Sequence, residues 1–178
     1  MIRFFLLFLL IQGVLFTAEL TPPAQAYLVQ PFTSGLAWIS GHLIELTGRE
    51  IIATGVIIRD VSTQFAVEIA AGCNGVEAMI LLVAAMLAFP SPWRYKLWGI
   101  LIGIIAIQGL NLVRIVSLFF LGMWNETAFE WAHLYVWQAL IMLDALAVWL
   151  LWLRALPRTK ADRGSDGSDE DHAAPATP

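Results

Sequence analysis

Three side chains in this sequence have the types that acyl-transfer chemistry needs: Cys73, Arg114 and His133. Cys73 is the only cysteine of the chain, and it lies between two glycines in Gly72-Cys73-Asn74-Gly75, directly before a long apolar run. A thiolate is a nucleophile, an imidazole can move a proton, and a guanidinium can hold the negative charge that develops on a carbonyl oxygen. The residue types therefore predict a cysteine-dependent enzyme, provided that the fold brings the three groups together.

The composition places the elements that carry these residues in a membrane. Of the 178 residues, 59% are hydrophobic and only 13% are charged, and the mean hydropathy is +0.74. A soluble domain of this size does not need so much apolar surface. The formal net charge of −4 owes much to an acidic C-terminal tail, and no basic domain or nucleic-acid motif is present, which argues against a nucleic-acid partner. A single cysteine excludes an intramolecular disulfide.

The N-terminal residues, about 2–20, predict a first membrane span with Arg3 in front of it. The same stretch also fits a secretory signal peptide, because Ala24-Gln-Ala26 resembles a cleavage site. We expect a retained anchor, since the apolar run is long for a signal peptide. Under either interpretation, residues 27–72 form an extraplasmic (periplasmic) segment.

The extraplasmic segment begins with an amphipathic helix over residues 33–47, capped by Thr33 or Ser34 and ended by Gly48. The helix is too short and too polar to span, so we expect it to lie on the membrane surface. From residue 50 to 69 the apolar period changes to two, which predicts a β-hairpin with one strand over 52–58, a turn over 59–63 and a second strand to 69.

Three more spans are predicted, over about 74–90, 97–123 and 131–153, joined by a basic loop at 90–96 and an acidic loop at 125–130. We therefore expect an all-α membrane bundle of about four spans, with residues 1–155 as one membrane-embedded domain and residues 156–178 as a disordered cytoplasmic tail. Seven of the 10 Lys and Arg residues fall on one side of such a bundle, which predicts that both termini are cytoplasmic. These seven are Arg3, Arg94, Lys96, Arg154, Arg158, Lys160 and Arg163.

Helix rise places the three candidate groups at one depth. Cys73 lies at the outer end of the second predicted span, and His133 opens the fourth from the same side. Arg114 is about 25 Å along the third span from its inner start near Leu97, at 1.5 Å per residue. A thiol, a guanidinium and an imidazole from three helices therefore share the outer level of the bundle.

Each of the three groups also has a structural interpretation on its own. An isolated cysteine is often an inert core residue, an arginine near a span end can reach the lipid head groups, and a histidine can serve as an interfacial anchor. An arginine in an apolar run costs roughly 2.5–3.5 kcal/mol on insertion, so it is rarely incidental. The coincidence of all three at one depth favours catalysis.

Other polar residues have supporting or alternative roles. Glu77 lies one turn below Cys73 and can pair with Arg114, and Asn111 lies one turn inward of Arg114 and can orient it. Gln108 and Asp144 both fall near the midplane, where they can hydrogen-bond to each other or form part of a proton path. Two further histidines, His42 on the amphipathic helix and His172 in the tail, are not candidates.

The chain resembles the exosortase/archaeosortase family of membrane cysteine transpeptidases over most of residues 1–155. The resemblance rests on Cys73-Asn74-Gly75 at the head of one span, Asn111-Leu-Val-Arg114 in the next, and His133 opening the one after. Asn74 departs from the Ser or Thr that usually follows the cysteine. With four spans where many relatives have about eight, the chain is most similar to the short exosortase H branch.

The resemblance implies an activity and a place in the cell. It implies a hydrolase or transpeptidase of the bacterial inner membrane that cleaves a C-terminal sorting signal (short motif, apolar span and basic end) from exported proteins. Cys73 would be the nucleophile, His133 the general acid/base and Arg114 the transition-state stabiliser, and the acceptor nucleophile stays open. No metal or cofactor is expected, because no Cys/His cluster has ligand spacing. The alternatives are a non-enzymatic membrane scaffold, or a small transporter subunit that uses Gln108 and Asp144.

Overall fold

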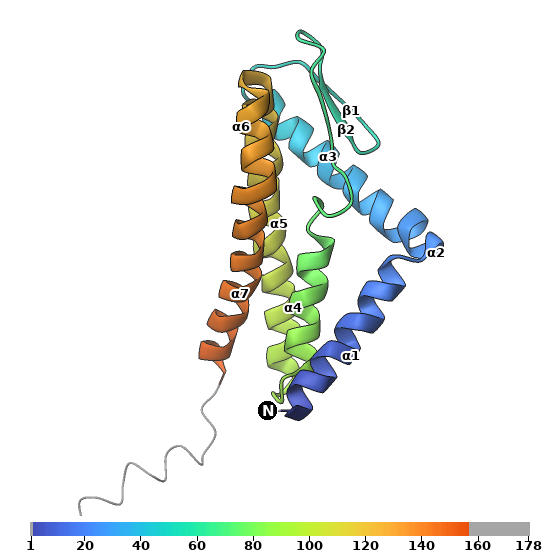
Figure 1. The fold of residues 1–178 in the computed structure, drawn as a ribbon, viewed down its shortest axis with the longest axis vertical. Coiled ribbons are helices and arrows are strands. Elements are labelled where there is room, and N and C mark those ends of the chain that lie inside the picture. Colours follow the sequence, from blue (N-terminus) through green and yellow to red (C-terminus); the bar gives the residue numbers. More distant parts are fainter. Residues whose placement is uncertain (1, 157–178) are drawn as a thin grey trace, which may run out of the picture.

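The protein, described by a computed structural model over residues 2–156, is a helical bundle with a small sheet at one end (Figure 1). The principal helices are α1 (Ile2–Glu19), α3 (Gln30–Glu45), α4 (Val76–Ala88), α5 (Trp93–Trp124) and α7 (Trp137–Ala155). Short segments α2 (Pro22–Ala24) and η1 (Gln25–Val29, a π-helical turn) lead into α3 without a break, and α6 (Glu126–Trp131) and η2 (Ala132–Val136, also π-helical) lead into α7. The predicted all-α membrane bundle is confirmed.

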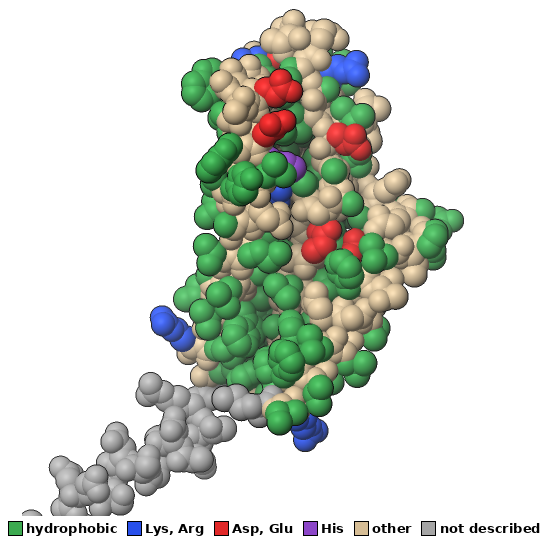
Figure 2. All heavy atoms as spheres, in the orientation of Figure 1, with side chains coloured by type: hydrophobic (Ala, Val, Ile, Leu, Met, Phe, Trp, Pro, Cys, Tyr) green, Lys and Arg blue, Asp and Glu red, His purple; other side chains and the backbone are tan. Residues whose placement is uncertain are grey.

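Within residues 2–156, three helical segments are long and apolar enough to cross a membrane: Ile2–Glu19, Trp93–Trp124 and Glu126–Ala155. Their outward surfaces are rich in exposed Leu, Ile, Phe and Trp side chains, which suits contact with lipid (Figure 2). The segment predicted as the span over 74–90 corresponds to α4, which has only 13 residues. A helix of that length is about 20 Å long, less than the roughly 30 Å of bilayer hydrocarbon.

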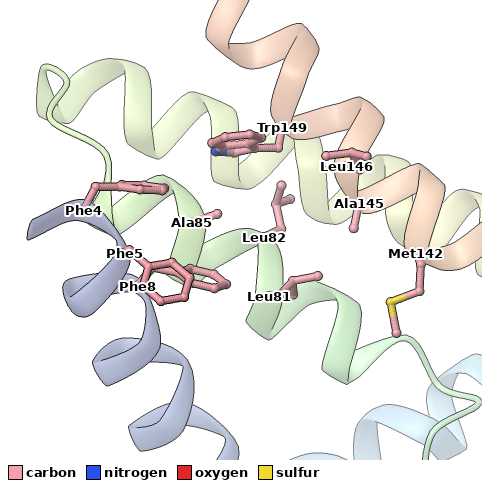
Figure 3. A pocket seen from close by; sticks show the side chains of 10 residues that line it. All are labelled: Phe4, Phe5, Phe8, Leu81, Leu82, Ala85, Met142, Ala145, Leu146 and Trp149. Carbon is pink, nitrogen blue, oxygen red and sulfur yellow. The ribbon is translucent and has the colours of Figure 1, made fainter. Parts of the chain in front are cut away.

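Helix α4 is the centre of the bundle, because it packs against α1, α5 and α7. One apolar core surrounds it, formed by Ala78, Leu82, Met86, Ile107, Ile141, Ala145 and Trp152. Towards the N-terminal end of α1, an apolar cavity of about 260 Å³ opens between α1, α4 and α7 (Figure 3). Phenylalanines of α1 and Trp149 line this cavity, and none of Cys73, Arg114 and His133 does.

A second core lies under the sheet and is formed by α3, the strands and the C-terminal half of α5. Its buried members are Leu36, Ala37, Ile44, Ile51, Ile58, Ile69, Ile115 and Phe119. Helix α3 crosses from the end of α1 towards the sheet (Figure 1) and begins earlier than the predicted residue 33. Thr33 is therefore not a cap: its hydroxyl donates to the Val29 carbonyl within the helix, at 2.7 Å.

The sheet has three antiparallel strands in the order β1 (Ile51–Thr54), β2 (Ile57–Asp60) and β3 (Ala66–Glu68). The prediction of a single strand over 52–58 was wrong, because the chain turns at Gly55, where φ is +59°. That conformation is easy for glycine and allows the two-residue turn that pairs Thr54 with Ile57. The alternating pattern continues through such a turn, so the period alone did not show it.

An ion pair ties the loop before the sheet to the sheet itself. Arg49 Nη1 donates to Asp60 Oδ2 at 2.6 Å, and the guanidinium also lies over the Phe120 ring of α5. Hydrogen bonds from Ser62, together with Arg49, lower the pKa of Asp60 to about 2. The sheet is thereby fixed against the end of α5 that carries the candidate site.

Candidate active site

Cys73 lies in the turn between β3 and α4. The turn is held at its start by the hydrogen bond from the Ile69 amide to the Val56 carbonyl, and at its end by Asn74 Oδ1, which accepts from the Val76 amide at 3.0 Å. Gly75 has φ +77°, and a Cβ there would lie 2.8 Å from Gln108 Nε2. Only glycine allows the backbone at position 75 to approach α5 this closely, so the position of the Cys73 thiol depends on Gly75.

The thiol contacts the imidazole of His133. Cys73 Sγ and His133 Nε2 are 3.0 Å apart, a hydrogen-bonding distance for sulfur and nitrogen. His133 lies in η2, where the helix widens by one residue, and its ring stacks on Phe129 with the planes 14° apart. Local π-helical turns are frequent at functional sites. This turn and the Phe129 ring together set the direction in which the imidazole points.

Arg114 is buried beside the same sulfur atom. Its side chain is only 1% exposed, and Nη2 lies 3.5 Å from Cys73 Sγ. Its Nε and Nη1 atoms have no hydrogen-bond partner among the described residues. Burying a guanidinium without a carboxylate partner costs folding free energy. Such an arrangement is therefore expected where the charge stabilises a bound group.

The surroundings of Cys73 favour the protonated thiol over the thiolate, because they raise its pKa. Burial raises the pKa of Cys73, Glu77 raises it further by its negative charge, and the Arg114 guanidinium acts in the opposite direction. Because the net effect is a raised pKa of Cys73, Arg114 alone does not produce a thiolate at neutral pH. The thiol therefore needs a base, and His133 Nε2 is at the distance from which it can accept the proton.

The three groups open into one cleft of about 80 Å³. It lies between the end of β3, helix α5 and the α6–η2 segment, and Figure 2 shows the hollow on this face, with histidine and basic atoms at its base. Its lining consists of Val67, Glu68, Ile69, Ala70, Cys73, Arg114, Ile115, Leu118, Phe129 and His133. A carbonyl carbon held at the sulfur would have both a proton acceptor and a hydrogen-bond donor within reach.

The residues predicted to support the site have different partners from those expected. Asn111 does not hydrogen-bond to Arg114; its amide donates to Gln108 Oε1 at 3.3 Å. Glu77 forms no ion pair with Arg114, since Arg49–Asp60 is the only salt bridge among residues 2–156. Both predictions were wrong because spacing along a helix gives depth, whereas pairing depends on how neighbouring helices are rotated.

The prediction that Gln108 and Asp144 hydrogen-bond to each other was also wrong. Gln108 Nε2 donates to the Asn74 carbonyl at 3.2 Å and lies 3.3 Å from Met79 Sδ. Asn74, which is 1% exposed, also donates to Thr33 Oγ1 of α3 at 3.1 Å. Asn74 thus ties the cysteine turn to α5 through its backbone carbonyl and to α3 through its side-chain amide, and only the second contact depends on the side chain.

The family model described as Transmembrane exosortase (Exosortase_EpsH) matches residues 2–153. The chain belongs to this family. No curated protein and no solved structure gave a match. The exosortase model covers every element of the bundle that carries the site, from α1 to α7, so the resemblance expected from the three short motifs is confirmed.

Sequence reasoning missed one side chain of this candidate site and the element that carries it. Residues 125–130 were predicted to be a loop, but α6 is a helix, because Asn125 caps it by accepting from the Ala128 amide at 2.9 Å. This helix places Phe129 one turn before His133, so that the two rings stack. The signal was available: an Asn cap and an aromatic residue four positions before the histidine.

The remaining predictions fall outside the site or outside the described part. His42 is exposed, with Nδ1 2.8 Å from the Trp38 carbonyl and its ring against Trp38. Within residues 2–156, no group of three or more His, Cys, Asp or Glu side chains is placed to hold a metal ion. The tail, including His172, lies beyond the described residues.

Proposed function

We propose that this exosortase-family protein is a membrane cysteine transpeptidase or peptidase that cleaves C-terminal sorting signals from exported proteins. The observation that carries the proposal is the contact of one sulfur with both an imidazole at 3.0 Å and a buried guanidinium at 3.5 Å. These three groups supply a nucleophile, a proton carrier and an oxyanion donor, the set that peptide-bond cleavage through a thioester requires.

The first half of the reaction forms the thioester. His133 Nε2 takes the thiol proton, and the thiolate of Cys73 attacks the carbonyl carbon of the scissile peptide bond. Arg114 donates hydrogen bonds to the oxygen as it becomes negative. The C–N bond then breaks, the imidazolium returns its proton to the leaving amine, and the exported part stays bound to sulfur as a thioester.

The second half regenerates the thiol. An acceptor amine or a water molecule loses a proton to His133 and attacks the thioester carbonyl, again with Arg114 at the oxyanion. The C–S bond breaks, and the imidazolium protonates the departing thiolate of Cys73. The product is a new amide when the acceptor is an amine and a free carboxylic acid when it is water.

The arrangement of charges supports a cytoplasmic position for both termini. Arg3 and Lys96 line one pocket at the end of the bundle opposite the sheet, and Lys96 Nζ donates to the Leu87 carbonyl there. Lys and Arg near span ends favour the cytoplasmic side. We accordingly place the protein in the inner membrane, with the Cys73 cleft on the periplasmic side, where an exported protein would meet it.

A reporter library tests the activity. Each reporter has a signal peptide, a soluble domain, a short randomised segment, an apolar span of about 20 residues and a basic end, and is produced together with the protein in a Gram-negative host. We expect a subset of reporters to lose the tail with the wild type and none with Cys73→Ala. Cleavage that persists in Cys73→Ala, or a library in which nothing is cleaved, would refute the proposal.

The two non-enzymatic alternatives give different results in the same strains. A scaffold loses abundance in Arg114→Ala but tolerates Cys73→Ala, and a transporter subunit depends on Asp144 and not on Cys73. Capture of the reporter on Cys73 separates them from the enzyme, because only a thioester is released by hydroxylamine at neutral pH. Mass spectrometry of the released reporter then identifies the bond that was cleaved.

A further inference from the structure

Strand β3 has a free edge next to the site. The sheet order is β1-β2-β3, and among the residues that the structure describes β3 pairs only with β2. The Asp60 amide donates to the Phe65 carbonyl, and the Ile69 amide donates to the Val56 carbonyl. Because successive residues of an antiparallel strand face alternately towards and away from the partner, the backbone groups of Ala66 and Glu68 face away from β2.

A cleft beside these free backbone groups adjoins the cleft of the thiol. A cleft of about 490 Å³ lies between β3 and α6, lined by Phe65, Ala66, Val67, Glu68, Gly122, Glu126 and Phe129. Three of these residues, Val67, Glu68 and Phe129, also line the smaller cleft that holds Cys73, Arg114 and His133. The cleft beside the free edge and the cleft of the reacting sulfur therefore adjoin at these three residues, and part of this hollowed face is visible in Figure 2.

An unpaired strand edge usually needs protection, since it can pair with another chain. Here the edge is short, and Ala66 and Glu68 are exposed. The cleft beside it has no described element that pairs with these amides and carbonyls. An extended peptide can form main-chain hydrogen bonds with such an edge, which is how several peptide-binding domains recognise their ligands.

We propose that the substrate segment just before the scissile bond binds in extended form along β3, as a fourth strand of the sheet. The inference rests on the proposed function. In that function the exported, N-terminal part of the substrate lies at the sheet end of the protein, and the apolar span that follows it lies in the membrane. Since β3 also runs from the outer turn towards Cys73, the added strand is parallel to β3. The backbone groups of Ala66 and Glu68 hold it, and the next peptide bond reaches the sulfur.

Two matched proline variants test the added strand. Ala66→Pro removes an amide that faces the free edge, and leaves the β2–β3 hydrogen bonds in place. Ala53→Pro makes the same change in β1, where by the same alternation the amide faces the opposite edge of the sheet, away from the clefts. The measurements are KM and kcat for a reporter that the wild type cleaves, and the rate at which iodoacetamide alkylates Cys73.

We expect Ala66→Pro to raise KM by about 2- to 12-fold, the effect of losing one hydrogen bond, while the alkylation rate of Cys73 stays at the wild-type value. Ala53→Pro should leave KM unchanged. Equal KM values for the two variants would overturn the inference while leaving the proposed function intact. If the wild type cleaves no reporter, the proposed function is refuted, and the inference about β3 is refuted with it.

A second measurement uses the wild-type protein, so it does not depend on the folding of a variant. Synthetic forms of the cleaved reporter carry a single N-methylated amide at successive positions before the scissile bond. Because only alternate residues of a strand face β3, we expect KM to rise for N-methylation at every second position. A scan in which no position, or every position equally, raises KM would contradict strand addition.

Discussion

Replacing Arg114 is the most informative perturbation of the site. Its guanidinium is 1% exposed, touches Cys73 Sγ through Nη2 at 3.5 Å, and has Nε and Nη1 free of partners among the described residues. If these donors serve the oxyanion, their removal affects the transition state more than the resting thiol. We therefore compare Arg114→Gln, which removes the charge, with Arg114→Lys, which keeps the charge but loses the planar donor geometry.

The size of the effect follows from comparable donors in other enzymes. Loss of one oxyanion donor typically costs about 2.7–4 kcal/mol, or a factor of about 100–1,000 in kcat. We expect Arg114→Gln to lose at least this much, since it removes the charge together with the donors. Alkylation of Cys73 by iodoacetamide develops no oxyanion. The alkylation rate should also fall in Arg114→Gln, because Arg114 lowers the pKa of the thiol. We expect this fall to be smaller than the fall in kcat.

The assay measures kcat for a cleaved reporter and the alkylation rate on the same purified variants in detergent. Size-exclusion profiles and thermal unfolding show whether each variant is folded, because a buried residue has been changed. A folded Arg114→Gln variant that retains kcat within a few-fold of the wild type would refute the oxyanion role. Equal losses in kcat and in alkylation would show that Arg114 acts only on the thiol.

Three further predictions concern charge and backbone around the site. Glu77→Gln should speed the alkylation of Cys73 at neutral pH, because Glu77 raises the pKa of the thiol; a slower rate would contradict this. Since the pKa of Asp60 is lowered from 3.8 to about 2, its contribution to stability should be present above about pH 4 and disappear as the pH falls towards 2. Acid unfolding should therefore be less steep in Asp60→Asn, and an unchanged profile would contradict the stabilising role of the Asp60 hydrogen bonds with Ser62 and Arg49. Gly75→Ala should lower thermal stability by roughly 1–3 kcal/mol, because φ is +77° and the new Cβ would meet Gln108; wild-type stability would show that the turn can relax.

The agreement between sequence and structure is best for properties that depend on composition and on distance along a helix. Apolar content is enough to recognise a membrane bundle, and helix rise is enough to place Cys73, Arg114 and His133 at one end of it. Both arguments use only the chemistry of single residues and the fixed geometry of a helix. Neither needs to know which helix faces which.

Direction around each helix could not be read from spacing. Glu77 was expected beside Arg114 and Gln108 beside Asp144, yet the first pair forms no ion pair and Gln108 binds the Asn74 carbonyl instead. Local periodicity likewise missed the turn at Gly55, because alternation continues through a two-residue turn. These features depend on packing between segments that are distant in the chain.

The sequence by itself determined the class of protein, the depth of the three reactive groups and the chemistry of which they are capable. Only the tertiary structure decided that they touch. The π-helical turn and the Phe129 ring aim His133 Nε2 at the sulfur, and the contact of Gly75 with α5 brings the cysteine turn to Arg114. Contact within hydrogen-bonding distance requires three helices to be packed at fixed rotations, and that information lies in the core rather than in any one segment.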